Sequence, residues 1–215
     1  MTRAKRALDV AGALLGLAVA SPLMAAIALA IRLGDGGPVF FRQTRVGRNG
    51  VPFTIWKFRT MVRGGEQAGP QVTASGDARV TTVGAWLRRL RFDEVPQLLN
   101  ILAGDMSFVG PRPEVPAFAA KYDADQRRVL ELVPGLTDPA TLAYRNEAEM
   151  LAGWPDPERI YAEQIMPDKI HMSLRYARRA TVWSDLRIIM QTLGAIVGAG
   201  PPPAARPARP FPGAG

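Results

Sequence analysis

Two adjacent carboxylates, Asp93 and Glu94, are the side chains of this sequence best placed to do chemistry. Pro96 and apolar residues at helical spacing follow them, a pattern that predicts a helix beginning near Asp93 and ending before Gly104. The helix dipole keeps a carboxylate at a helix N-terminus ionised, as a nucleophile requires. Such a pair can divide the work, with one carboxylate attacking phosphorus and the other holding a divalent cation on a diphosphate.

The same residues also fit a purely structural role. Asp is a favoured N-cap residue and Glu is favoured in the first turn of a helix. A proline in that turn costs no hydrogen bond, because the N–H that it lacks would have been unpaired. The residues around Asp93 therefore leave helix capping and catalysis both open.

Candidate phosphate ligands lie on both sides of the carboxylate pair along the chain. They are Lys57, Arg59, Arg88, Arg89, Arg91 and Arg112. Arg112 stands out because Pro111 and Pro113 restrict the backbone around it, so it loses little conformational freedom on binding a phosphate. Its planar guanidinium also matches phosphate oxygens through two parallel hydrogen bonds. Each of these cations can equally be a solvated surface charge.

The elements that must hold these residues are short and mostly helical. Apolar runs between Gly and Pro residues predict strands, and apolar residues three and four apart predict helices. The predicted elements are strands at 39–41 and 53–56 around a turn at 47–50, a helix at 82–90, the helix from Asp93, and helices over 158–197 with a break at Pro167. Most of these elements are helices, and one short pair of strands precedes them.

An apolar stretch near the N-terminus, from Val10 to Ile31, contains no Asp, Glu, Lys or Arg. As a straight helix it extends roughly 33 Å, about the thickness of the hydrocarbon core of a bilayer. One interpretation is a single membrane span. A cleaved signal peptide is another, but apolar sequence continues well past the small residues at 18–20 that resemble a cleavage site.

Two features favour a helix that enters and leaves the membrane on the same side. Basic residues flank both ends of the apolar stretch, so a crossing helix would place one basic flank on the wrong side. At its centre, Ser21 and Pro22 predict a kink, because proline cannot donate a hydrogen bond to the preceding turn. The Ser21 hydroxyl is a candidate partner for the carbonyl that Pro22 leaves free. A kinked span and a re-entrant helix both remain open.

Composition bounds the kind of protein. The 215 residues suffice for one ordinary domain. The formal net charge of +8 indicates an anionic partner, which can be nucleic acid, a phospholipid surface or a phosphorylated substrate. With no cysteine, disulfides, thiolate nucleophiles and cysteine-based zinc sites are excluded.

Several motifs, taken in order, resemble those of the bacterial sugar transferases, the monotopic phosphoglycosyl transferases. The resemblance covers roughly residues 3–197, and several ordered motifs are far more specific than any one of them. They are residues 57–61, 79–81, 87–89, 93–100, 104–107 and 110–113, with Lys5, Arg6, Asp9 and the pair Ser21 and Pro22 near the N-terminus.

The resemblance implies a reaction. The Asp of the Asp-Glu pair attacks the β-phosphate of a UDP-sugar, UMP leaves, and an aspartyl-phosphosugar forms. Polyprenyl phosphate, such as undecaprenyl phosphate, then attacks this intermediate and gives a polyprenyl-diphospho-sugar, the first membrane step of glycoconjugate or exopolysaccharide assembly. By motif match, Asp93 is the nucleophile and Glu94 helps to bind Mg²⁺. The implied substrate-binding residues are Lys57, Arg59, Arg88, Pro111, Arg112 and Pro113.

The resemblance also implies a location and an architecture, the family's own α+β arrangement. The N-terminal helix is expected to be re-entrant and broken at Ser21 and Pro22, so that the protein enters one leaflet from the cytoplasmic face of the bacterial inner membrane. Residues 1–33 form this helix, and residues 34–198 form a mainly helical catalytic domain with a short β element and interfacial amphipathic helices. Residues 199–215, rich in Pro, Ala and Gly, are expected to be a disordered tail.

One segment departs from the family's pattern. After residues 134–137, many members continue with a Gly-rich, aromatic segment that ends in Asn-Gly-Arg, whereas this chain continues with Asp-Pro-Ala-Thr-Leu-Ala-Tyr-Arg-Asn-Glu at 138–147. This departure leaves the identity of the sugar open.

Two rival functions also fit an anchored basic chain. A nucleic-acid binder explains the charge, but no recognition helix or series of stacking aromatics occurs at a known spacing, so nucleic acid is not an expected partner. A non-catalytic scaffold in polysaccharide assembly is the other rival, and the Asp-Glu pair argues against it through the resemblance.

Overall fold

The computed structural model describes residues 2–65, 68–69, 72, 76–152 and 154–198. The tail predicted to be disordered, 199–215, lies outside the described residues. In chain order the elements are α1 (Arg3–Asp35), β1 (Phe40–Val46), η1 (Arg48–Gly50), β2 (Pro52–Phe58), α2 (Thr82–Arg89), η2 (Phe92–Gln97), α3 (Leu98–Ala103), β3 (Ser107–Val109), α4 (Pro116–Ala119), η3 (Gln126–Glu131), β4 (Gly135–Thr137), α5 (Pro139–Ala143), α6 (Glu147–Leu151), α7 (Pro157–Ile160), the π-helical turn η4 (Tyr161–Ile165), α8 (Met166–Ala177) and α9 (Val182–Ile196). The α+β, mainly helical fold is confirmed.

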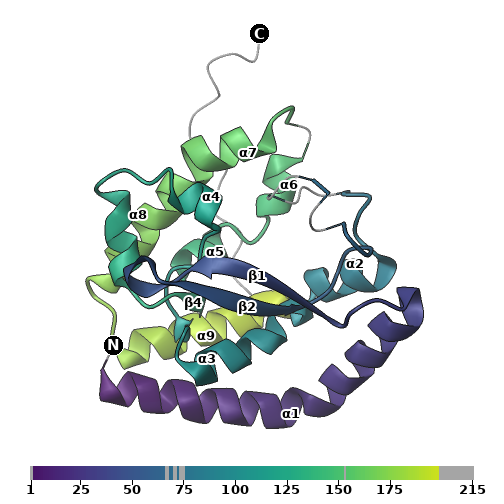
Figure 1. Ribbon diagram of the computed structural model, residues 1–215. Helices are drawn as coiled ribbons and strands as arrows, with labels where there is room; N and C mark the ends of the chain where they lie inside the picture. Colours follow the sequence, from purple (N-terminus) through teal and green to yellow (C-terminus); the bar gives the residue numbers. More distant parts are fainter. Residues whose placement is uncertain (1, 66–67, 70–71, 73–75, 153, 199–215) are drawn as a thin grey trace.

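Helix α1 is continuous and runs along one side of the molecule (Figure 1). Pro22 lies inside it, so the predicted break at Ser21 and Pro22 is not an interruption of the helix. The Ser21 hydroxyl donates to the Ala18 carbonyl at 2.9 Å. That carbonyl is the one that the missing N–H of Pro22 leaves free, which confirms the predicted compensation and explains why the helix continues.

Two small two-stranded sheets lie at the centre of the fold. Strands β1 and β2 form an antiparallel hairpin with Phe40 opposite Phe58 and Val46 opposite Pro52, which confirms the predicted strand pair. Strands β3 and β4 pair in parallel; they were not predicted because three-residue strands carry too little pattern. Just beyond β3, Gly110 approaches Gly135 so closely that a Cβ on Gly135 would lie 2.1 Å from Gly110 N. Glycine therefore lets the segment leading to Arg112 pack against β4.

The core consists of three hydrophobic clusters, two of which include α1. Ala13 of α1 packs with Ile55 of β2 and with side chains of α3. Farther along, Ile27 and Ile31 of α1 pack with Phe58 and Leu87. The third cluster joins α4, η3, α6, η4 and α8 on the side of the molecule away from α1 (Figure 1).

The C-terminal helices differ from the prediction in where they break. Pro167 lies in the first turn of α8, directly after the π-helical turn η4, so the predicted break is a change of helix type and not an end of the helical run. The helical run ends instead at 178–181, and Thr181 then caps α9 in a capping box with Ser184. Helix α9 begins beside the start of α1, where Lys5 and Asp185 form an ion pair of 2.5 Å.

Candidate active site

The carboxylate pair lies on a tight turn and not at the start of an α-helix. The predicted single helix is a 3₁₀ turn, η2, followed by α3, and Arg91 in the left-handed conformation (φ 58°) occupies the N-cap position. Pro96 cannot donate the N–H that an α-helix would send to the Phe92 carbonyl, which favours the tighter turn. Asp93 caps no helix among the described residues, so the capping interpretation of Asp93 is wrong.

The Asp93 carboxylate faces the cavity without a partner. The residue is 8% exposed, and its Oδ1 atom receives no hydrogen bond from the residues that the structure describes. A buried polar atom without a partner costs about 1–3 kcal/mol, and more when charged. This oxygen therefore has hydrogen-bonding capacity that the described residues do not use.

Glu94 has the opposite environment. Arg112 donates to both of its carboxylate oxygens, at 3.1 Å to Oε2, and Lys57 Nζ lies 3.1 Å from Oε1. Burial alone would raise the pKa of Glu94, but Arg112 and Lys57 outweigh it and hold the pKa well below its ordinary value. Glu94 is therefore ionised, and it holds Arg112 and Lys57, two of the predicted phosphate ligands, in place.

The pKa of Asp93 is raised to about 6. Burial is the largest cause and the negative charge of Glu94 adds to it, whereas Lys57, Arg91 and Arg88 act in the opposite direction. The neighbouring carboxylates thus differ in both hydrogen bonding and proton affinity. This is the pattern expected when one carboxylate reacts and the other supports it.

Two more arginines are held close to Asp93 by uncharged partners. Arg88 Nε donates to the Thr60 hydroxyl at 2.7 Å, and Arg91 Nη2 donates to the Arg145 carbonyl at 3.1 Å. Neither arginine has a carboxylate partner among the described residues. Helix α2, which carries Arg88, packs directly on the Thr60 backbone, because a Cβ at Gly84 would lie 1.9 Å from the Thr60 carbonyl oxygen.

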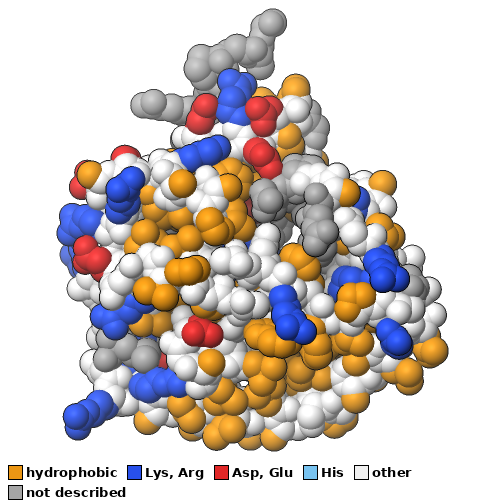
Figure 2. Space-filling model, viewed as in Figure 1, with side chains coloured by type: hydrophobic (Ala, Val, Ile, Leu, Met, Phe, Trp, Pro, Cys, Tyr) orange, Lys and Arg blue, Asp and Glu red, His pale blue; other side chains and the backbone are white. Residues whose placement is uncertain are grey.

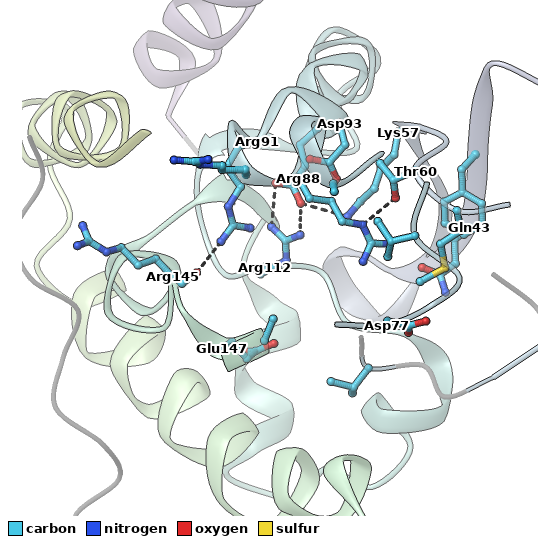
Figure 3. Close-up of a pocket in the computed structure, with 18 of the residues that line it drawn as sticks. Gln43, Lys57, Thr60, Asp77, Arg88, Arg91, Asp93, Arg112, Arg145 and Glu147 are labelled. Atoms are coloured by element: carbon cyan, nitrogen blue, oxygen red, sulfur yellow. Dashed lines mark hydrogen bonds and ion pairs between the residues drawn. The ribbon is translucent and has the colours of Figure 1, made fainter. Parts of the chain in front are cut away.

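These groups line one cavity of about 1020 Å³, at the upper end of the size range of ligand pockets. Figure 3 shows Lys57, Arg88, Arg91 and Arg112 gathered around Asp93. The cavity lining contains nine Arg or Lys residues and six Asp or Glu residues. A cavity of this size and charge fits a large anionic ligand with more than one phosphate.

Comparison with known proteins agrees with this geometry. The bacterial sugar transferase family matches residues 1–199. The chain belongs to the bacterial sugar transferase family.

Two curated relatives cover the chain almost completely and have names that specify different sugars. The UDP-N-acetylgalactosamine-undecaprenyl-phosphate N-acetylgalactosaminephosphotransferase of Aeromonas hydrophila is 37% identical over 198 residues, which are 90% of this chain and 43% of that protein. The UDP-glucose:undecaprenyl-phosphate glucose-1-phosphate transferase of Escherichia coli K12 is 38% identical, over 88% of this chain and 39% of that protein. The chain thus spans about two fifths of the length of these relatives.

A third relative is similar in length. The exopolysaccharide production protein ExoY of Rhizobium meliloti is 35% identical over 208 residues, which are 90% of this chain and 85% of that protein.

Most of the residues predicted for a sugar transferase site come together in the structure. Those that line the cavity are Lys57, Arg88, Asp93, Glu94, Arg112 and Pro113. Two predicted residues do not line it. Arg59 is buried against Gly37, whose added Cβ would lie 2.1 Å from Arg59 Nη1. Pro111 acts through its backbone, accepting from Gly135 N at 2.9 Å. A residue within a motif can therefore face away from the site, which its spacing in the sequence does not reveal.

Sequence reasoning missed the other side of the sugar transferase cavity. Its side chains come from distant segments, and only the departure at 138–147 marked one of these segments in advance. The missed lining residues include Gln43, Tyr144, Glu147, Tyr161 and Lys169.

Proposed function

We propose that this chain is a phosphoglycosyl transferase that moves a sugar-1-phosphate from a UDP-sugar to polyprenyl phosphate, with Asp93 as the nucleophile. The observation that carries the proposal is the buried, unpartnered Oδ1 of Asp93 in a cavity rich in Arg and Lys. Family membership and the names of the relatives support the same reaction class.

The proposed reaction has two displacements at one phosphorus atom. Asp93 attacks the β-phosphorus of the donor, the bond from this phosphorus to the bridging oxygen breaks, and UMP leaves with the electron pair of that bond. An oxygen of polyprenyl phosphate then attacks the same phosphorus, and the Asp93 carboxylate is released. The attacking groups and the leaving groups are all oxyanions, so neither step requires a general base, in contrast to a hydroxyl nucleophile.

The surrounding cations offset the charge of the phosphates. Arg88 and Arg91 have guanidinium groups with no carboxylate partner among the described residues, so they can bind phosphate without breaking an ion pair. Arg112 and Lys57 are already aligned by Glu94. Stabilising charge with groups fixed in advance is the usual largest contribution to phosphoryl transfer.

Mg²⁺ remains part of the proposal, but its favoured protein ligand is now Asp93 and not Glu94. Mg²⁺ typically binds one or two carboxylates together with substrate phosphates. The free Oδ1 of Asp93 fits such a ligand, whereas Glu94 has both oxygens engaged by cations and is not favoured as a direct one. Within the described residues no three acidic or histidine side chains form a metal-binding group. When bound, Mg²⁺ would supply positive charge to the diphosphate.

We also propose that α1 is re-entrant and that the catalytic body lies on the cytoplasmic face of the membrane. The helix is long and apolar enough to cross a bilayer, but its whole length follows the body. Arg6 donates to the Ile101 and Leu102 carbonyls near one end, and Ile31 packs against Leu87 near the other. A crossing helix would carry its far end away from a body in water. Figure 2 shows hydrophobic side chains along the edge where α1 runs.

Release of UMP from the donor alone tests the proposed covalent mechanism. Without polyprenyl phosphate, the protein is expected to release about one UMP per active site and to carry a phosphosugar on the peptide containing Asp93. Asp93→Asn is expected to bind donor but to show neither burst nor adduct, because the amide keeps the shape and loses the nucleophile. The burst should disappear in EDTA and return with Mg²⁺. Normal turnover by Asp93→Asn would disprove the mechanism.

A further inference from the structure

The cavity has two chemically different sides. Around Asp93 it is cationic, with Lys57, Arg88, Arg91 and Arg112. The opposite wall is built from the end of α5, α6, η4 and α8, and it mixes aromatic and charged side chains. The wall residues used here are Tyr144, Glu147, Tyr161 and Lys169. In Figure 3, Arg112 lies between Asp93 and Glu147, while the Arg145 side chain points away from Arg112.

Glu147 and Lys169 present a hydrogen-bond acceptor and a donor at one point of this wall. Lys169 Nζ lies 2.7 Å from Glu147 Oε2 and 5.3 Å from the centre of the Tyr161 ring, so its position is fixed from two sides. Glu147 Oε1 receives no hydrogen bond from the residues that the structure describes, and the side chain is 27% exposed. One oxygen of the pair is therefore open to a ligand.

The charge of this pair selects for neutral, hydroxylated groups. A carboxylate repels a phosphate, and the ammonium of Lys169 is already paired, so the wall is a poor second phosphate site. A sugar hydroxyl can donate to Glu147 Oε1 and accept from Lys169 at the same time. Tyr144 lines the wall beside them, with its ring packed in the hydrophobic core and its hydroxyl donating to Asp168 at 2.6 Å.

The wall is also tied to the reacting centre. Arg91, two residues before Asp93, holds the Arg145 carbonyl at 3.1 Å, two residues before Glu147. The nucleophile turn and the wall are thus connected by one hydrogen bond across the cavity. Glu94 chiefly, and Glu147 in addition, raise the pKa of Arg112, which shows that the Glu147 charge is felt at the predicted phosphate ligand. A sugar attached to a phosphate at Arg112 would reach this wall.

We propose that Glu147 and Lys169 form the sugar-binding subsite and that the sugar is a neutral, hydroxylated pyranose. This inference rests on the proposed transferase function. Two relatives at 37% and 38% identity have names that specify different sugars, so overall similarity does not decide the sugar. Residues 138–147, where the chain departs from the family's pattern, supply Glu147 itself and the Tyr144 ring.

The test compares neutral and acidic donors in Glu147→Gln. With UDP-glucose, UDP-galactose, their N-acetylamino forms and UDP-glucuronate, the unmodified protein should prefer a neutral donor. Glu147→Gln should lower kcat/KM for that donor by about 10-fold or more, the effect of losing one hydrogen bond to a charged group. Glu147→Gln should also raise kcat/KM for UDP-glucuronate relative to that for the neutral donor, because Lys169 becomes free to pair with a sugar carboxylate. Inhibition by UMP should not change.

Matched variants keep the result interpretable. Glu163→Gln removes the same charge from an exposed position of η4 outside the cavity and should leave the donor ratio unaltered. Donor affinities can also be measured by calorimetry in the Asp93→Asn protein, which tests the subsite without any chemistry. A failure of the proposed subsite can then be distinguished from a failure of the covalent mechanism. The inference is overturned if Glu147→Gln leaves all donors unaffected. It is equally overturned if all donors and UMP weaken together, which would make the wall a nucleotide site.

Discussion

Asp93 and Glu94 are neighbours in sequence with opposite electrostatic surroundings. Glu94 is neutralised by two cations, whereas Asp93 is buried, lacks a partner at Oδ1 and has a raised pKa. Burying Asp93 ionised in this way works against stability, which is typical of a residue retained for reactivity. The contrast arises within one tight turn, since two adjacent residues of η2 direct their carboxylates into different surroundings.

The raised pKa of Asp93 predicts the pH dependence of UMP release. In the proposed mechanism only ionised Asp93 attacks, so kcat/KM should rise about tenfold per pH unit below the pKa of about 6 and level off above it. Arg88 lowers the pKa of Asp93, so Arg88→Gln should move this acid limb to higher pH. Arg63→Gln, an exposed change outside the cavity, should leave it in place. An acid limb near pH 4 in every variant would contradict the raised pKa.

At the residue scale, the sequence predicted the reacting centre better than its surroundings. Asp93, Lys57 and Arg112 line the same cavity, as the motifs predicted. Each of them belongs to a short motif that can be recognised in the sequence. Glu147 and Lys169 could not be placed, because no local pattern indicates that α6 and α8 face η2 across a cavity. Arg59 is two residues after Lys57, so a continuing strand would place both side chains on one face. Strand β2 ends at Phe58, however, and packing against Gly37 decides the direction of Arg59.

At the element scale, the sequence predicted long periodic segments and missed short ones. Helix α2 and the hairpin β1–β2 were predicted because apolar spacing and glycine-rich turns mark them. The turn η2 and strands β3 and β4 arise from tertiary context, including the contact of Gly110 with Gly135. Helix α1 combines both cases, since its extent was predicted, whereas it continues through Pro22, where the Ser21 hydroxyl donates to the Ala18 carbonyl.

Topology mapping tests the proposed re-entrant path of α1. The chain contains no cysteine, so single cysteines at positions 3 and 36 report unambiguously on each end of the helix. Both should be labelled only from the cytoplasmic side. The double change Ser21→Ala and Pro22→Leu restores a regular helix and should place the two labels on opposite sides of the membrane in part of the population. Ser21→Ala alone keeps the proline and should retain the native pattern.

Opposite-side labelling of the unmodified chain would refute the re-entrant path. It would also require α1 to leave the surface formed by Ile55, Leu98, Phe58 and Leu87, which it covers in this structure. The measurement therefore tests the membrane path and the packing of α1 together.

At the scale of the whole molecule, α9 provides a second surface suited to lipid. Its buried face carries Asp185 and Ile188, and its exposed side chains recur three and four residues apart. The exposed stripe consists of Trp183, Leu186, Met190, Leu193 and Val197. Lys5 joins the start of α1 to Asp185 on the buried face, so the first turn of α9 lies beside the start of the proposed membrane helix. An amphipathic helix with an exposed Trp is typical of the interface between headgroups and acyl chains.

Exposed arginines around the start of α9 predict a preference for anionic lipid. Arg178 and Arg179 precede the helix, and Arg187 lies one turn beyond Trp183, which is 81% exposed. Each arginine near an anionic surface contributes about 1 kcal/mol to binding. A fluorophore on a cysteine replacing Trp183 should therefore enter an apolar environment in vesicles with anionic lipid, and less so in neutral vesicles or at high salt.

Removing two of these arginines separates lipid electrostatics from general loss of charge. Arg178→Gln with Arg179→Gln should abolish the gain from anionic lipid, by about 2 kcal/mol in the docking equilibrium of α9, and should leave insertion of α1 intact. Arg127→Gln with Arg128→Gln removes the same charge from the exposed turn η3 and should leave the probe signal unaltered. A probe at 183 that stays in water in every vesicle would show that α9 does not contact lipid. Membrane association would then depend on α1 alone.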